Sequence, residues 1–218
     1  MLSAGNNIFR SAASLALVAV IGTTLLAGVD RLTEARIAEQ EKRAILDQLG
    51  QLISPDLYNN ELQQDLFSFQ DDLYFPRGQT VVTYRARLDG EAVAVVLKFA
   101  AVNGYNGKIN LLVGINENGT LCGVRVTSHK ETPGLGDAIE VERGDWILGF
   151  FGRALGNPPP DGWAVKRDGG EFDQFTGATI TPRAVVEAVR LALEFYADHK
   201  SFLFESPAES DPGEKKGS

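Results

Sequence analysis

The chain has 218 residues, 44% of them hydrophobic, which suits one sizeable core with appendages rather than two large domains. Its formal net charge of -8, without a dense run of Lys or Arg, argues against sequence-independent nucleic-acid binding. A single cysteine, Cys122, and two distant histidines exclude a disulfide framework and argue against a zinc or iron–sulfur site.

The first predicted element is an apolar helix near the N-terminus. Residues 11–29 carry no charged side chain, and a helix of this length approaches the roughly 30 Å of a hydrocarbon core. We therefore expect a short segment over residues 1–10 and an uncleaved transmembrane helix over residues 11–30. The alternative is a cleaved signal peptide. It is disfavoured because Arg10 is the single basic residue before the apolar run and because the residues before Asp30 form a poor cleavage site.

The charges beside this apolar helix do not settle its orientation. Arg10 precedes it, whereas Arg31, Arg36, Lys42 and Arg43 follow it, and charge counting would place the C-terminal side inside. Long domains cross membranes largely regardless of such charges, so this bias carries little weight.

A helical stalk over residues 31–53 and a folded domain over residues 54–205 are expected next. The stalk lacks Pro and is rich in helix-forming residues, and Pro55 is suited to start another short turn. Residues 79–88 and 91–102 alternate in polarity around Asp89-Gly90, which predicts a β-hairpin. Residues 109–115 and 121–128 predict a second hairpin, in which Cys122 packs in the core beside Val124.

The remainder of the domain predicts short elements and one long helix. Asp145 is expected to cap an apolar turn over residues 146–151, where Trp146, Phe150 and Phe151 belong to the core or, as the alternative, to a docking face. A loop over residues 157–162 and a short strand over residues 163–166 follow. Apolar residues at helical spacing then predict a helix from Pro182 to about residue 200.

We therefore expect an α+β fold with an antiparallel sheet and flanking helices that pack to one side of it. The tail over residues 206–218 is rich in Pro, Gly, Glu, Lys and Ser, a composition typical of disorder.

The most informative stretch is residues 173–181, which read Asp-Gln-Phe-Thr-Gly-Ala-Thr-Ile-Thr. It places threonine hydroxyls on a turn of small residues just before a helix, where unpaired N–H groups and the helix dipole favour a phosphate. The alternative is that Thr179 and Thr181 only cap this helix.

This stretch resembles the motif of proteins that carry FMN as a phosphoester on threonine, in which the last Thr of Thr-Gly-Ala-Thr is modified. That residue is Thr179 here. Residues 129–137, His-Lys-Glu-Thr-Pro-Gly-Leu-Gly-Asp, resemble a second signature of the same proteins, a loop beside the flavin. Together with the apolar N-terminal run, these motifs resemble the G subunit of the Rnf ion-translocating electron transport complex and, less closely, the C subunit of the sodium-pumping NADH:quinone reductase.

The resemblance implies a redox-carrier subunit without a complete active site of its own. It implies other membrane, iron–sulfur and flavin subunits as partners, and a separate flavin transferase that uses FAD and magnesium. It also implies a single-pass protein of the bacterial cytoplasmic (inner) membrane with its FMN domain on the periplasmic side. The expected FMN-binding residues are Thr179, Asp173, Thr176, Gly177, Ala178, Glu131, Thr132, Gly134, Leu135, Gly136 and Lys166.

Each of these roles has a simpler alternative. The glycines of residues 131–136 permit positive φ and close approach to a flat ring, but such loops also form ordinary turns. Lys166 or His129 would place a cation near the flavin, or is a solvated strand residue. Glu131 would contact the flavin, or would only pair with Lys130 or Arg125 at the surface. For the whole protein, the alternatives are a membrane-tethered FMN-binding sensor or regulatory module without turnover, and an adaptor without flavin.

Overall fold

The computed structural model describes residues 2–205, and side chains are left undescribed for residues 2–14 and for several positions between residues 30 and 42. The chain divides into two compact units, residues 1–47 and residues 48–218. The predicted disorder of residues 206–218 lies outside the described residues.

The first unit is helical. A single helix, α1 (Leu2–Leu52), runs through it without a break, so the predicted boundaries at residues 10 and 30 do not interrupt the helix. Its large apolar side chains between Leu15 and Leu32 are exposed. Among the residues that the structure describes, no helix combines the length and the apolarity needed to cross a membrane, and the predicted span over residues 11–30 is not confirmed.

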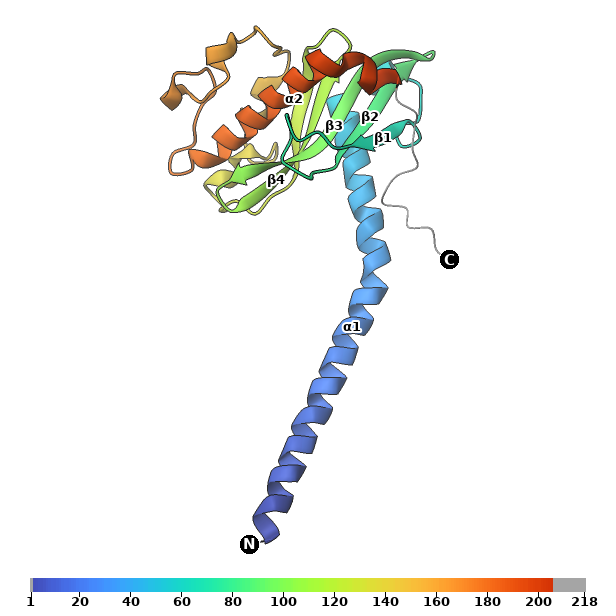
Figure 1. Cartoon of the computed structure of the whole chain (residues 1–218), viewed down its shortest axis with the longest axis vertical. Coiled ribbons are helices and arrows are strands. Elements are labelled where there is room, and N and C mark those ends of the chain that lie inside the picture. The colour runs from blue at the N-terminus through green and yellow to red at the C-terminus, as the bar shows by residue number, and fades with distance from the viewer. Residues whose placement is uncertain (1, 206–218) are drawn as a thin grey trace. The chain divides into compact units, whose positions relative to one another are not determined.

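The second unit is built on a five-stranded antiparallel sheet in which every strand pairs with its neighbour in sequence (Figure 1). The strands are β1 (Leu66–Phe69), β2 (Val81–Leu88), β3 (Glu91–Gly104), β4 (Gly107–Asn116) and β5 (Leu121–Ser128). Both predicted hairpins are confirmed, while β1 was not predicted. Asp89 and Gly90 turn between β2 and β3 with positive φ at both positions, as a two-residue hairpin turn requires.

Helices cover both faces of the sheet. Helix α2 (Ile180–Glu205) lies across one face and buries its apolar side chains against β3 and β4 (Figure 1). On the other face, the last residues of α1 pack against β5, where Leu52 Cδ2 lies 3.1 Å from the position of a Cβ on Gly123. The prediction that the helices pack to one side was therefore wrong, because the buried Leu49, Leu52 and Ile53 serve the opposite face.

A bulge in β5 changes which side chains face the core. Ile115 pairs with Leu121 and Gly114 pairs with Gly123, so Cys122 is the extra residue. The bulge shifts the alternation of side chains between the two faces of the sheet, so Leu121, and not Cys122, joins Val124 in the core. The predicted shared face of Cys122 and Val124 was wrong for this reason.

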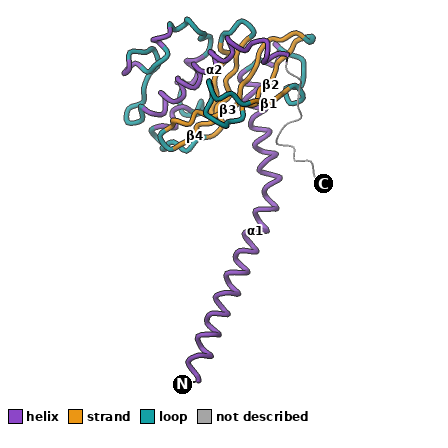
Figure 2. The backbone as a smooth tube through the Cα atoms, viewed as in Figure 1, coloured by secondary structure: helices purple, strands orange, loops and turns teal. Residues whose placement is uncertain are grey.

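Between β5 and α2, the chain forms single turns rather than regular elements (Figure 2). The predicted strand over residues 163–166, all of which the structure describes, does not form. Among these four residues, Val165 alone makes an isolated bridge, to Phe172. A 3₁₀ turn, Trp146–Phe150, occupies the predicted apolar turn, but the Asp145 side chain does not cap it. Phe150 is fully buried, as a core residue should be, whereas Phe151 is 74% exposed.

Helix α2 begins two residues before the predicted start and extends beyond the predicted end. Its first residue is Ile180, and Pro182 lies in the first turn, where the helix needs no N–H donor. The backbone departs from helical geometry at His199 and then resumes as far as Glu205, so the predicted end marks a kink.

Candidate functional site

A cavity of about 550 Å³ brings together the two motifs that the sequence singled out. Its walls come from the turn between β3 and β4, from residues 131–136, and from the residues around the start of α2. The lining residues are Tyr105, Glu131, Thr132, Leu135, Gly136, Arg167, Gly177, Ala178, Thr179, Ile180, Thr181 and Arg183.

Glu131 connects these three walls. Its carboxylate is 4% exposed and accepts hydrogen bonds from the backbone N–H of Asn106 at 2.9 Å and of Tyr105 at 3.3 Å. The fully buried Thr181 hydroxyl donates to the same carboxylate. The simpler alternative for Glu131, an exposed ion pair with Lys130 or Arg125, was therefore wrong, because the carboxylate is buried among these donors.

Close packing around this carboxylate requires a glycine at position 136. A Cβ there would lie 2.9 Å from Glu131 Cβ and 3.0 Å from Thr181 Oγ1. The same loop is closed by the backbone N–H groups of Leu135 and Gly136, which donate to the Thr132 carbonyl at 3.1 and 3.0 Å. Gly136 therefore lets the loop approach the first turn of α2.

His129 joins this loop to the following turn through both of its ring nitrogens. Its Nδ1 accepts the backbone N–H of Glu131 at 2.9 Å, and its Nε2 lies 2.8 Å from Glu140 Oε1, to which it donates. His129 does not line the cavity, so the structure does not place it among the residues that would surround a bound ligand.

Thr179 lies half-buried in the cavity wall, directly before the first residue of α2. A tight turn precedes it, with Gly177 at a φ of 83° and the N–H of Ala178 donating to the Phe175 carbonyl at 3.2 Å. The Thr179 carbonyl accepts the N–H of Arg183 at 3.4 Å, so Thr179 holds the N-terminal end of the helix. Its hydroxyl thus lies where the helix dipole stabilises negative charge.

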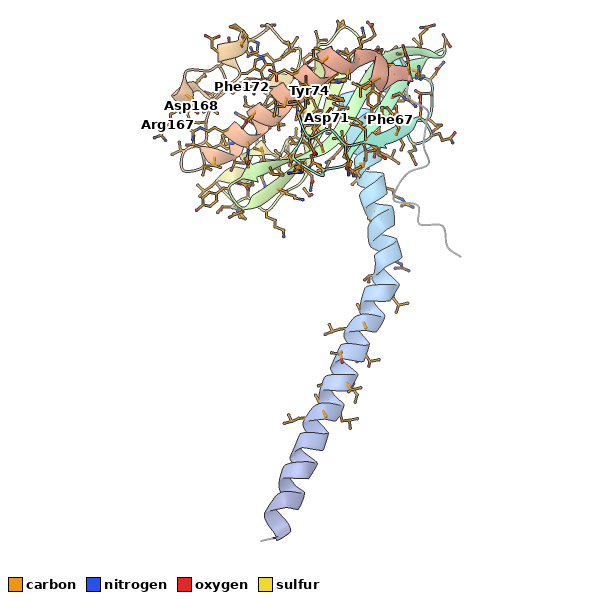
Figure 3. All side chains as sticks on the ribbon, in the orientation of Figure 1. Phe67, Asp71, Tyr74, Arg167, Asp168 and Phe172 are labelled. Carbon is orange, nitrogen blue, oxygen red and sulfur yellow. The ribbon has the colours of Figure 1, made fainter. Side chains whose placement is uncertain are left out.

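Two arginines that the sequence reasoning missed supply positive charge to the same cavity. The Arg183 guanidinium binds Asp168 through two hydrogen bonds, of 2.5 and 2.6 Å, which raise the pKa of Arg183 and lower the pKa of Asp168. Arg167 forms no ion pair with any residue of the described part. Figure 3 labels Arg167 beside Asp168, at the opposite end of the domain from Phe67. The sequence does carry a signal for Arg183. It follows Thr179 by four residues, a spacing that places two residues on the same side of a helix.

Four of the predicted residues do not line this cavity: Asp173, Thr176, Gly134 and Lys166. Lys166 Nζ instead pairs with Asp173 Oδ1 at 2.6 Å on the surface, and the Asp173 carbonyl accepts the indole N–H of Trp146 at 2.8 Å. These contacts hold the turn that leads to Thr179. They indicate a supporting role for Asp173 and Lys166.

Two family profiles match the chain. One, described as an FMN-binding domain, matches residues 104–194, and the other, described as an RnfG N-terminal region, matches residues 1–52.

Curated relatives from three bacteria agree with these matches, and each of the three is named as the G subunit of an ion-translocating oxidoreductase complex. The chain is 47% identical to the protein of Pseudomonas aeruginosa, over 90% of this chain and 92% of the relative. It is 44% identical to the protein of Vibrio cholerae, over 88% of this chain and 92% of the relative. The protein of Shewanella piezotolerans is 41% identical, over 93% of this chain and 95% of the relative.

Proposed function

The chain belongs to the family of G subunits of ion-translocating oxidoreductase complexes, and we propose that it carries its FMN as a phosphoester on Thr179. As a member of this family, it is an electron-transfer subunit with an FMN-binding domain.

The residues around Thr179 fit the phosphate end of FMN. The start of α2 presents backbone N–H groups and the positive end of the helix dipole. Arg167 lines the same wall and adds a guanidinium group, which suits phosphate oxygens, while the Arg183 guanidinium beside it is paired with Asp168. This match of an alcohol, a helix N-terminus and the guanidinium of Arg167 in one cavity is the observation that carries the proposal.

The rest of the cavity fits a flat aromatic ring. Leu135 is 43% exposed and Tyr105 is 66% exposed, and both line the cavity. Their exposed apolar surfaces would be covered by a bound isoalloxazine. When bound, the flavin supplies the redox chemistry, while these residues position the ring and limit its contact with water.

Attachment needs a separate enzyme. A threonine hydroxyl is a weak nucleophile without a base, and Glu131, the carboxylate that lines this cavity, is already occupied by three donors. We infer that a flavin transferase delivers FAD. The Thr179 oxygen would form a bond to the FMN phosphorus, the anhydride bond would break, AMP would leave, and the hydroxyl proton would pass to a base of the transferase.

We further propose that residues 11–30 anchor the chain in the bacterial cytoplasmic membrane, with the FMN domain on the periplasmic side. Residues 11–29 have no charge, and the described large apolar side chains from Leu15 to Val29 are exposed. The neighbouring iron–sulfur and flavin subunits of the complex would then donate electrons to the FMN and accept them from it. No feature of the described residues favours a regulatory module without turnover.

Intact mass measurement of the chain, purified from membranes of a host that contains the transferase, tests the covalent bond. We expect the mass of one FMN less one water, and flavin fluorescence that survives denaturing electrophoresis. Thr179→Ala should abolish both signals, whereas Thr176→Ala, which removes an exposed hydroxyl three residues away, should keep them. Peptide fragmentation that places the flavin on Thr176 or Thr181, or an unmodified wild-type chain, would refute the proposal.

A further inference from the structure

A second cavity, of about 770 Å³, lies on the sheet face opposite α2 and shares no residue with the first. One wall comes from the last residues of α1 and the segment that follows them. The other walls come from the end of β4, from β5, and from the 3₁₀ turn Trp146–Phe150 together with Phe151. The lining residues include Leu57, Asn116, Cys122, Arg125, Leu148 and Phe151.

The charge in this cavity is a guanidinium with an unused donor. Arg125 is half-buried, and its Nη1 donates to the Val124 carbonyl of its own strand at 2.9 Å. Its Nε is inaccessible and has no acceptor among the described residues. Burial lowers the pKa of Arg125, which the exposed Glu142 partly offsets without forming an ion pair within the described part. The buried Nε itself is out of reach, but the guanidinium is half-exposed and has one hydrogen bond, to Val124, among the described residues, so an anion that enters the cavity can bind its accessible nitrogen atoms.

The two polar groups beside Arg125 do not supply that anion. The Cys122 thiol donates to the Asn116 side-chain oxygen at 3.1 Å, and burial raises the pKa of Cys122 to about 11, so the thiol stays protonated at neutral pH. Arg125 therefore has no counter-ion among the described residues, because Glu142 forms no ion pair with it.

The rim of the cavity is apolar and exposed. Leu57 is 53% exposed, Leu148 is 39% exposed and Phe151 is 74% exposed. A cluster of exposed apolar side chains around a concave surface is typical of a protein interface, where aromatic residues and Arg are the usual anchors. The cavity therefore offers an apolar surface and a charged group at the same place.

We propose that this cavity docks a segment of a neighbouring subunit of the complex, in which a carboxylate pairs with Arg125 and an adjacent apolar side chain packs on Leu148 and Phe151. The charge of Arg125 selects an acidic group, because guanidinium groups bind carboxylates through paired hydrogen bonds. The apolar rim selects a polypeptide segment that carries hydrophobic side chains next to that acid. This inference rests on membership of a multi-subunit complex and is independent of how FMN is attached.

A photo-crosslinking amino acid in place of Phe151, in the intact complex in native membranes, tests this interface. We expect a crosslink to another subunit, at a peptide that contains Asp or Glu. Arg125→Gln should reduce the crosslinked fraction about tenfold or more, the effect of losing a charge pair at an interface. Arg77→Gln is the matched control, since Arg77 is 93% exposed at a distant loop, and it should leave the crosslink unchanged.

A second variant separates docking from folding. Leu148→Asp places a carboxylate beside the incoming carboxylate and should reduce the crosslink as Arg125→Gln does, while the flavin content and the melting temperature of the purified subunit stay at wild-type values. The proposal is overturned if the Phe151 crosslink survives both variants. A crosslink to lipid, to residues 206–218 of the same chain, or to nothing at all would also overturn it.

Discussion

Replacing Glu131 by Ala tests the hydrogen-bond arrangement that connects the walls of the cavity beside Thr179. The substitution leaves the Thr181 hydroxyl and the N–H groups of Tyr105 and Asn106 without their acceptor. A buried donor without an acceptor costs about 1–3 kcal/mol. Thr181 is fully buried and bears this cost in full, whereas the two N–H groups lie in an exposed turn and can bind water. We therefore expect the free energy of unfolding to fall by about 1–3 kcal/mol.

Urea and thermal unfolding of the full chain in detergent, followed by circular dichroism, measures this loss. For a folded unit of this size, the expected loss corresponds to a fall in Tm of about 5 °C. Lys130→Ala is the control, because Lys130 is an exposed neighbour on the same loop and its substitution should change stability by less than about 0.5 kcal/mol. A loss below about 1 kcal/mol for Glu131→Ala would show that the carboxylate does not connect the three walls.

Three further predictions concern single positions. Gly136→Ala should destabilise the fold by about 1–3 kcal/mol in urea titration, because the new Cβ meets a buried side chain at 2.9 Å, whereas Gly144→Ala has open space and should be near neutral. Cys122, whose pKa burial raises from 9.0 to about 11, should react with iodoacetamide at pH 8 about a hundredfold more slowly in the folded chain than in urea; equal rates would contradict its burial. The pKa of Asp168 is lowered by the Arg183 hydrogen bonds, so the stabilisation from this pair is present above the ordinary carboxyl pKa and is lost as pH falls through the depressed value. Carboxyl NMR titration should show the pKa of Asp168 rising in Arg183→Gln, and an unchanged value would contradict the pairing.

Local patterns in the sequence were enough to predict much of the fold. Alternating polarity and turn residues predicted both hairpins, since the Asp89-Gly90 turn depends only on local backbone preferences. The failures came where tertiary packing decides. The Cys122 bulge depends on the pairing of β4 with β5, and the packing of Leu52 on Gly123 depends on the chain before the sheet. Neither has a local signature.

The site was predicted in its parts but not in its connections. The glycine loop and Thr179 were recognised separately, and the structure places both around one cavity. The buried role of Glu131 was not recognised, because it needs donors from a turn some 25 residues earlier and from a helix 50 residues later. Arg167 was missed because an exposed arginine in a turn looks ordinary until its neighbours are known.

The long irregular stretch between the glycine loop and the threonine turn has an evolutionary consequence. From residue 137 to residue 176 it contributes only Arg167 to the wall of the cavity beside Thr179. Insertions or deletions that spare the contacts of Trp146, Lys166, Asp168 and Asp173 would leave the cavity walls in place, so the other turns of that stretch can differ in length and in the surface they offer to other proteins. In this architecture, partner choice and cofactor retention can evolve as separable traits.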